Sequence, residues 1–431
     1  MDLEVQYEVA CGLDVHSATI AACLVRNGPK GSPLYEARSF PTTLRGLTDL
    51  RDWLVAEKCQ AVGMEATGVY WMPVYSNLEG HVHLVVGNPS HMKNLRGHKT
   101  DRKDAKWIAS LMRHGLIRPS FVPPPVFRNA RALTRARRQL IEARTAVRNE
   151  ILRGLASQGL PLAKVLTNVF GVSGMAILEA LAEGRSVKEE LPKLVHRSVL
   201  AKLPALQAAI EAPLEEVPRV LLALGLKRHE ELEDHIQDME RRIETQLLPH
   251  RDVKGRLMAI PGISTTAANV ILAELGVDMS PWPTAAHIAA WAGLAPGSRE
   301  SGGKRMAAST RKGNTHLKTM LVEAASAAVR TKSCHLKNTF HRLRARMGYK
   351  KAIVAMAHKL LVIIYTLLTK NREYEEPKLS QTLSEKARKR AVKKRIEDLK
   401  RLGYLVEIKE IPTEAPPEKK RDKSKKVSKS A

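Results

Sequence analysis

Two short apolar segments near the start of the chain each lead into an acidic side chain. Residues 7–15 (YEVACGLDV) and 60–65 (QAVGME) have the apolar and β-branched composition of buried strands. Asp14 lies at the end of the first segment, and Glu65 ends the second. A charged side chain at the end of a buried strand is costly unless it is paired or binds an ion. The pattern therefore predicts a sheet whose strand ends carry acids.

Further segments complete an α/β domain around these two strands. Residues 18–26 and, more weakly, 34–40 predict strands, and a helix with one apolar face runs from about Thr42 to Glu57. After a short helix, residues 81–87 predict a fifth strand, and a last helix runs from about Asp101 to Arg113. The order β-β-β-α-β-α-β-α matches a ribonuclease H-like, or RuvC-like, domain.

A ribonuclease H-like fold places acids at the ends of adjacent central strands and on a later helix. Asp101 and Asp104 lie at positions i and i+3, so a helix presents both on one face. With Asp14 and Glu65 they form a candidate metal-binding quartet, because converging carboxylates repel one another unless divalent cations lie between them. Hard oxygen ligands suit Mg²⁺ or Mn²⁺, and two such ions would bind the attacking and leaving oxygens of a phosphodiester. Basic neighbours that would hold phosphate are Lys99, Arg102, Lys103 and Lys106.

Each acid also has a purely structural interpretation. Asp14 fits a turn residue, and Asp101 with Asp104 fits a pair that stabilises a helix N-terminus. The basic neighbours fit an ordinary solvated face. Because all four acids occupy positions that match one fold, we favour the catalytic interpretation.

The charge of the chain indicates its class of partner. Lys and Arg number 71 against 44 Asp and Glu, and the net charge of +27 destabilises a compact chain unless a polyanion neutralises it. Nucleic acid is therefore the expected partner, and a hydrophobic content of 44% supports folded cores. No run approaches a membrane span, the acidic start is unlike a signal peptide, and the four cysteines lack zinc spacing. We expect a cytoplasmic protein with reduced thiols and no membrane partner.

The middle of the chain predicts two long charged helices after the linker at residues 123–125. Residues 128–153 contain eight Arg and two Glu, and we expect this arginine face to lie along a nucleic-acid backbone. Apolar residues recur at the spacing of a coiled coil, which suggests that the two helices form an antiparallel hairpin or an arm of a dimer. An ordinary helical hairpin that packs within one chain fits equally well. The recurring residues are Leu133, Leu140 and Val147, and later Leu232, Ile236, Met239, Ile243 and Leu247. Residues 155–225, between the two repeats, are apolar and helical in pattern.

The last third of the chain contains two candidate phosphate-binding turns and a candidate nucleophile. Pro261 and Gly262, before a helix, indicate a helix-hairpin-helix motif whose backbone N–H groups face a phosphate, although Pro-Gly also marks any tight turn. Ser301 precedes Gly302-Gly303, where the backbone can approach a ligand closely, but a serine in such a loop is most often only a loop residue. Basic residues that would stabilise phosphate charge are Arg299, Lys304, Arg305, Arg311 and Lys312.

Four regions follow from these patterns. We expect a RuvC-like α/β domain over residues 1–122 and an all-α, coiled-coil region for oligomerisation over 123–252. A helical, serine-containing domain with the helix-hairpin-helix motif covers 253–375, with a core helix from about residue 350 to 368. A basic and partly disordered tail covers 376–431.

Six short motifs, in order over roughly residues 7–370, resemble the insertion-sequence 110 family of transposases. They are GLDVH, MEATGVYW, KTDRKDA, IPGIS, AGLAP and ESGGK. The resemblance implies that the acidic quartet of a RuvC-like domain is Asp14, Glu65, Asp101 and Asp104. It also implies that Ser301 is the serine of a second catalytic domain.

The resemblance further implies a mechanism and a set of partners. The serine attacks a DNA phosphodiester and forms a phosphoserine link, while the carboxylates and Mg²⁺ of a partner subunit assist. Members of the family pair donor and target DNA with a structured bridge RNA and assemble as homodimers and homotetramers. The long basic C-terminal extension departs from the family core, and its role is open.

Two other functions fit parts of the sequence. A RuvC-like, metal-dependent, structure-specific endonuclease would hydrolyse DNA with water and would use the four acids but not Ser301. A non-catalytic nucleic-acid-binding protein would use the acids only as caps and turns. The third region argues against the first of these, and the placement of all four acids argues against the second.

Overall fold

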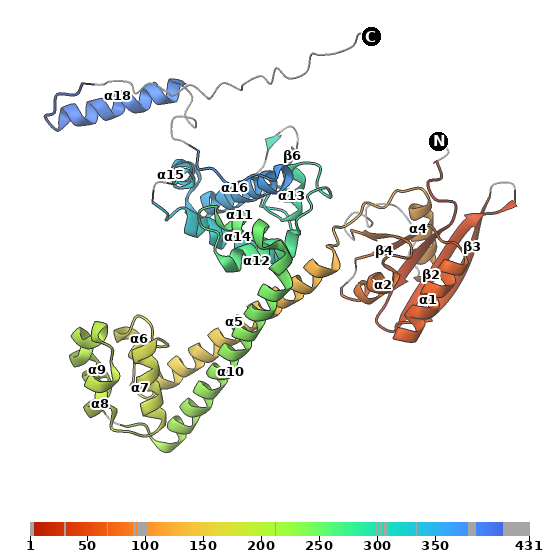
Figure 1. The fold of residues 1–431 in the computed structure, drawn as a ribbon. Helices are drawn as coiled ribbons and strands as arrows, with labels where there is room; N and C mark the ends of the chain where they lie inside the picture. Colours follow the sequence, from red (N-terminus) through yellow and green to blue (C-terminus); the bar gives the residue numbers. More distant parts are fainter. Residues whose placement is uncertain are drawn as a thin grey trace, which may run out of the picture.

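The computed structural model contains three folded parts in one chain (Figure 1). The structure describes residues 4–29, 32–66, 68–88, 92, 101–211, 213–297, 300–301, 304–305, 309–332, 334–377 and 385–407. Only the backbone is described for 101–103, 300–301, 304–305, 385–391 and 394. A sheet with helices forms the first part, two long helices with a small helical tip form the second, and a helical bundle forms the third.

The first part is built on a five-stranded mixed sheet in the order β3-β2-β1-β4-β5. Strand β1 pairs antiparallel with β2 and parallel with β4, while β3 and β5 complete the two edges. All five predicted strands are confirmed to within a few residues. Their bounds are β1 Ala10–Val15, β2 Thr19–Asn27, β3 Pro33–Pro41, β4 Ala61–Glu65 and β5 His83–Gly87.

Helices cover both faces of this sheet. On one face, α1 (Leu44–Ala56) and α2 (Trp71–Leu78) pack against the strands. On the other face lies α4 (Asp101–Arg113). Helix α4 is so close to β1 that a Cβ at Gly12 would lie 2.2 Å from the Ala105 carbonyl oxygen. Glycine is therefore required at residue 12, since any side chain would push α4 away from the sheet.

The second part is an arm made by α5 (Pro125–Ser157) and α10 (Glu216–Leu247), which lie side by side (Figure 1). Their ion pairs run in opposite order along the two helices, from Arg137–Glu240 to Arg144–Glu233 to Glu150–Arg228, so the helices are antiparallel. At the tip, a small helical unit packs with the ends of α5 and α10 around a separate core. It contains α6 (Leu162–Val165), α7 (Val172–Ala182), α8 (Val187–Leu194), η2 (Arg197–Lys202) and α9 (Leu203–Ala209).

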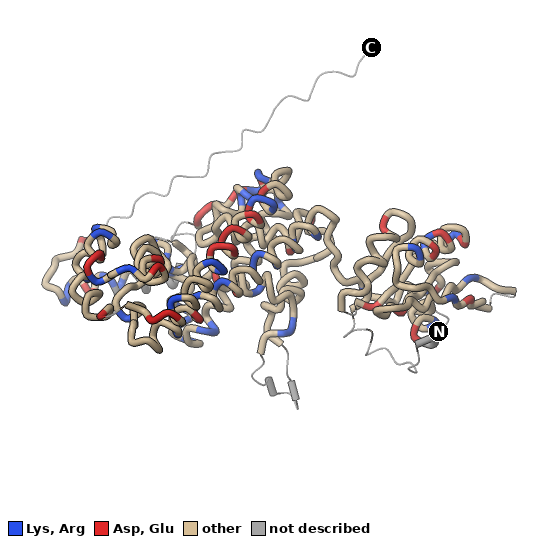
Figure 2. The backbone as a smooth tube through the Cα atoms, turned by 90° about the horizontal axis from the view of Figure 1, so that it is seen from below, with Lys and Arg blue, Asp and Glu red and all other residues tan. Residues whose placement is uncertain are grey.

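The arginines of α5 are used within the molecule. Seven of the eight make ion pairs with acids, and Figure 2 shows basic and acidic segments interleaved over the helical parts. The pairs are Arg128–Glu79, Arg131–Glu274, Arg135–Glu274, Arg137–Glu240, Arg138–Glu142, Arg144–Glu233 and Arg148–Glu233. The expectation of an arginine face laid along nucleic acid is therefore corrected. Six of these cations hold α5 against other elements, Arg138 pairs within α5, and the acids opposite them would repel a polyanion.

His229 joins the arm to its tip as a neutral hydrogen-bond acceptor. It is buried, its Nε2 accepts from Arg148 Nε at 2.8 Å, and its ring stacks on Phe170. Burial, and then the charge of Arg148, lower the pKa of His229. Below the ordinary histidine pKa of about 6.5, His229 is protonated in the unfolded chain but stays neutral in the folded chain. The free energy of unfolding therefore falls as the pH falls.

We expect the melting temperature of the arm to fall between about pH 7.5 and pH 5.5, and we expect His229→Gln to weaken that dependence. A glutamine oxygen can still accept from Arg148 but does not titrate. Thermal unfolding followed by circular dichroism at the two pH values tests this. If native chain and variant lose the same number of degrees, His229 does not cause the effect.

The third part is a bundle around one large core that also includes the base of the arm. Its helices are α11 (Arg251–Met258), α12 (Thr265–Leu275), α13 (Ala285–Trp291), α14 (Thr315–Ala328), α15 (His335–Met347) and α16 (Tyr349–Lys370). The predicted core helix is confirmed as α16. Beyond the bundle lies α18 (Glu385–Arg401), which is drawn away from the other helices in Figure 1.

One statement from the sequence needs correction. Helix α16 is 22 residues long and contains an 18-residue window with a mean hydropathy of 1.9, which is long and apolar enough to cross a membrane by length and composition alone. Its apolar face instead packs in the core of the bundle, where residues such as Met356, Leu360 and Ile364 are fully buried. A core helix surrounded by other helices has this composition without any membrane.

Candidate functional site

Asp14 and Glu65 lie next to each other where the neighbouring inner strands β1 and β4 end, and we call this end of the sheet the acidic edge. Strands β1 and β4 are parallel neighbours in which Leu13 pairs with Met64, so the next residue on each strand is the acid. Both side chains are partly buried. Since parallel neighbouring strands end at the same edge, the predicted pair of acids shares one location.

The direction of α4 brings its first turn to the same edge. Its last residue, Arg113, accepts hydrogen bonds through its carbonyl from the Gln6 and Tyr7 amides just before β1, at 2.9 and 3.1 Å. Because Ala105 packs over Gly12, α4 runs antiparallel to β1 and begins near the end of β1. Asp104 therefore lies towards the acidic edge, partly buried, and the backbone of Asp101 is one turn earlier.

The side chains that would complete this edge are only partly described. The structure gives no side-chain position for Asp101, Arg102 or Lys103, and Lys99 lies outside the described residues. Lys106 lies over the Tyr35 ring, with Nζ 4.3 Å from its centroid.

The structure adds one residue that the sequence analysis did not single out. His16 Nε2 lies 3.1 Å from Asp14 Oδ2. The motif GLDVH contains this histidine, and its position two residues after Asp14 could have indicated that the two side chains interact.

The chemistry of these donors suits a hard divalent cation, although the described side chains do not form a finished site. Asp14, Glu65 and Asp104 offer carboxylate oxygens at one edge, the ligand type that Mg²⁺ and Mn²⁺ prefer. Among the described side chains, no three His, Cys, Asp or Glu groups are grouped so as to hold one ion. The side chain of Asp101, the fourth member of the predicted quartet, is not among those described.

Ser301 lies in a short β-hairpin in the third part of the chain. Strands β6 (Glu300–Ser301) and β7 (Lys304–Arg305) pair antiparallel, with Ser301, the last residue of β6, opposite Lys304, the first residue of β7. Gly302, Gly303 and Arg299 lie outside the described residues, and the side chains of Ser301, Lys304 and Arg305 are not described. Figure 1 shows β6 on the helical bundle and β4 in the separate sheet domain.

The base of this serine hairpin is a second pair of extended segments. The Gly297 amide donates to the Ser309 carbonyl at 3.0 Å, and Pro296 bridges to Thr310. Arg311 and Lys312 follow and are exposed. A turn then leads into α14, whose N-cap is Asn314.

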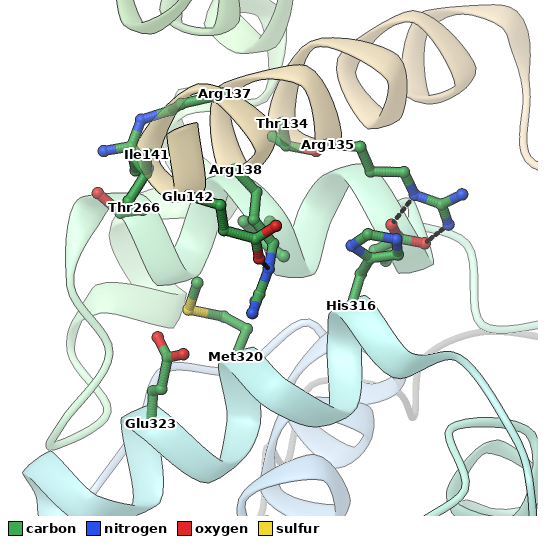
Figure 3. Close-up of a pocket in the computed structure, with 12 residues that line it drawn as sticks. Thr134, Arg135, Arg137, Arg138, Ile141, Glu142, Thr266, His316, Met320 and Glu323 are labelled. Carbon is green, nitrogen blue, oxygen red and sulfur yellow. Dashed lines mark hydrogen bonds and ion pairs between the residues drawn. The ribbon is translucent and has the colours of Figure 1, made fainter. Parts of the chain in front are cut away.

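A buried carboxylate, that of Glu274, binds Asn314, the residue that links the base of the serine hairpin to α14. Glu274 is fully buried and accepts from Asn314 Nδ2 at 2.6 Å, while Asn314 Oδ1 accepts from the Leu317 amide at 3.0 Å and caps α14. Arg135 forms two hydrogen bonds to Glu274, at 2.9 and 3.0 Å (Figure 3), and Arg131 Nε lies 3.0 Å from the same carboxylate. One side chain thus connects the arm helix α5, helix α12 and the base of the serine hairpin.

A cavity of about 210 Å³ opens beside this network, between α5, α12 and α14 (Figure 3). Arg138 pairs with Glu142 across its α5 side, and His316 and Glu323 extend from α14. Basic and acidic groups are mixed on this lining, so its charge does not point to one class of ligand.

The turn at Pro261 and Gly262 is explained by packing. Gly262 has a φ of +88°, and a Cβ there would lie 2.3 Å from the Ala324 carbonyl oxygen and 2.5 Å from the Ala328 amide nitrogen of α14. Ser264 caps α12 by accepting from the Ala267 amide at 3.2 Å. Glycine is therefore required here for contact with α14, and a phosphate contact at this turn stays a prediction.

Comparisons with known proteins agree with each other. A family model of DEDD transposases of the IS110 type matches residues 11–158, and one described as the transposase IS116/IS110/IS902 family matches residues 254–341. A probable family 20 transposase of Pseudomonas aeruginosa is 30% identical over 331 residues, covering 73% of this chain and 85% of the relative. The transposase for insertion sequence element IS1111A of Coxiella burnetii is 26% identical over 330 residues, covering 74% and 80%.

Proposed function

The chain belongs to the IS110 family of transposases, and from this premise we propose how its residues recombine DNA. Ser301 attacks a DNA phosphodiester and forms a phosphoserine link. Asp14, Glu65, Asp101 and Asp104 hold the divalent cations, Mg²⁺ or Mn²⁺, that assist the reaction. The observation that carries this proposal is the meeting of Asp14, Glu65 and the first turn of α4 at one sheet edge.

We assign the first part to the RuvC-like fold. The central strands β1 and β4 are neighbours, Asp14 is the last residue but one of β1, Glu65 ends β4, and a later helix begins near the same strand ends, which is the arrangement expected of this fold. When bound, a divalent ion would polarise the phosphodiester and stabilise the oxygens on which negative charge develops. Lys99, Arg102 and Lys103 lie in or next to the start of α4 in sequence and would hold the neighbouring phosphates.

The serine step conserves the number of phosphate ester bonds. As the Ser301 Oγ–phosphorus bond forms, one phosphorus–oxygen bond to a sugar breaks, and the released sugar hydroxyl takes up the equivalent of the proton that Ser301 loses. Attack by another DNA hydroxyl reverses these changes, so rejoining needs no ATP. Cations next to the serine would stabilise the transition-state charge: Arg299, Lys304, Arg305, Arg311 and Lys312.

We further propose the partners and the assembly. Donor and target DNA are paired through a bridge RNA, which leaves the protein to hold backbones, in part through the helix-hairpin-helix turn at Pro261 and Gly262. The arm takes part in a homodimer or homotetramer. Buried residues seven apart on α10 (Leu222, His229, Ile236 and Ile243) pack within one chain, so the contact between subunits would use other faces of the arm. The acids of one subunit would then meet Ser301 of another in the cytoplasm, at the bacterial DNA.

Removal of divalent ions tests the role of the acids. We expect a chelator to slow formation of the protein–DNA adduct by about 1,000-fold or more, because several kcal/mol of transition-state stabilisation are lost. Separate addition of Mg²⁺ and Mn²⁺ identifies the ion that restores the reaction. Asp14→Asn should behave like the chelated enzyme, whereas Asp49→Asn, an exposed acid on α1, should not.

Analysis of the cut DNA ends separates this proposal from hydrolysis by water. Free 5′-phosphate ends without trapped protein, at any time in the reaction, would identify a RuvC-like endonuclease. Full activity of Asp14→Asn in chelator would contradict the use of the acids altogether.

A further inference from the structure

The surface where α15 meets α16 has a charge balance unlike that of the arm. Between residues 324 and 372 the chain contains eleven Lys and Arg and no Asp or Glu. Five of these cations are exposed at the end of α15 and the start of α16, and we call them the α15–α16 basic surface. They are Arg342, Arg344, Arg346, Lys350 and Lys351.

These cations lack the internal partners that the arginines of the arm have. In the part of the chain that the structure describes, none of the five makes an ion pair, although 21 such pairs occur elsewhere. The acid that faces α15, Glu376, uses one oxygen for the His335 amide and the other for the Tyr374 hydroxyl at 2.6 Å. Burial, and then repulsion by Arg342, lower the pKa of Lys359 on α16. Positive charge is therefore concentrated here without compensation.

Helix stability explains only part of this arrangement. Arg344 and Arg346 lie in the last turn of α15, where cations interact favourably with the helix dipole. Lys350 and Lys351 lie in the first turn of α16, where the dipole disfavours cations, and that turn contains no acid. Two lysines at a position that disfavours the helix indicate that they bind a molecule other than this chain.

We propose that the α15–α16 basic surface binds the phosphate backbone of duplex DNA. Unpaired cations on adjoining helix ends match a polyanion, and DNA is what a transposase must hold. Single-stranded nucleic acid would instead need aromatic rings on which bases stack. The exposed ring here, Tyr349, already contacts the Phe340 ring edge and lies 6.0 Å from the Arg344 guanidinium. The proposal rests on the transposase function but on neither Ser301 nor the acids.

Two triple variants with the same loss of charge test this proposal. The first, Arg346→Gln with Lys350→Gln and Lys351→Gln, removes three cations of the surface. The matched control, Arg138→Gln with Arg241→Gln and Arg242→Gln, removes three cations of the arm that are paired with Glu142 or Asp238. Affinity for a duplex of random sequence is measured over a salt series in chelator, so that no cleavage chemistry enters.

We expect the first variant to reduce the slope of log affinity against log salt by up to about 2.7, or about 0.9 for each lost phosphate contact. The control should keep the native slope. The melting temperature of the first variant should equal or exceed that of the native chain, because two unfavourable cations leave the start of α16 and only one favourable cation, Arg346, leaves the end of α15.

Three results would overturn the proposal. The first is a native slope in the surface variant, and the second is an equal reduction in both variants, which would reflect net charge alone. The third is loss of binding to a structured RNA with unchanged binding to duplex DNA, which would assign the surface to RNA. Because these assays involve no bond breakage, they remain informative even if Ser301 is not the nucleophile.

Discussion

Ser301→Ala is expected to abolish the covalent protein–DNA adduct, with a loss of at least about 1,000-fold, because the hairpin then carries no nucleophilic oxygen. The substitution leaves the hairpin intact, since β6 and β7 pair through their backbones. DNA affinity should stay within about twofold, because phosphate contacts by the neighbouring cations remain. Labelled DNA on a denaturing gel measures the adduct, and a filter-binding assay measures the affinity.

Ser309→Ala provides the matched control for this experiment. Ser309 lies at the base of the same hairpin, is exposed, and contributes its backbone carbonyl to the bond with Gly297. The control should form the adduct at the native rate. An adduct that persists in Ser301→Ala would show that another residue is the nucleophile.

Glu274→Ala is expected to lower the free energy of unfolding by about 3 kcal/mol, at the lower end of the usual cost of breaking a buried ion pair. Its carboxylate is fully buried, while the side chains of Arg131 and Arg135 are 18% and 35% exposed and can regain some water. Asn314 also loses its acceptor, so the base of the serine hairpin loosens. We expect the melting temperature to fall by roughly 10 °C.

The matched control is Glu142→Ala, which removes the same charge from the lining of the same cavity. Glu142 is 63% exposed and pairs only with Arg138 one turn away, a type of pair that contributes about 0.5 kcal/mol or less. Equal melting temperatures for the two variants would contradict the role of Glu274. Glu274→Gln, which preserves the shape, should lie between them.

The sheet domain could be predicted because short stretches of sequence determine its strands and the positions of its acids. Apolar strands with acids at their ends specify both the elements and the edge where Asp14 and Glu65 lie, and the register of β1 with β4 confirms their adjacency. The position of α4 could not be read in the same way. It depends on Gly12, whose missing side chain lets α4 approach; a glycine in a strand can mark a close approach, but it does not tell which element approaches.

The role of the arginines in α5 was not predictable because their partners are remote. Arg135 and Glu274 are 139 residues apart, and Arg137 and Glu240 are 103 apart. A local count of charge shows only a basic helix, and only the fold reveals which acids neutralise it. The same reasoning favours the α15–α16 basic surface, because no acid in the described structure pairs with its cations.

The antiparallel course of α5 and α10 gives the tip a special status. The chain leaves at the end of α5 and returns at the start of α10, so the unit between them is an insertion whose core is completed by the adjoining ends of α5 and α10. Neither family model covers residues 159–253. The length of this unit can therefore change in evolution or in protein engineering, provided that the contacts with the ends of α5 and α10 are kept, without moving the sheet domain or the serine hairpin in space.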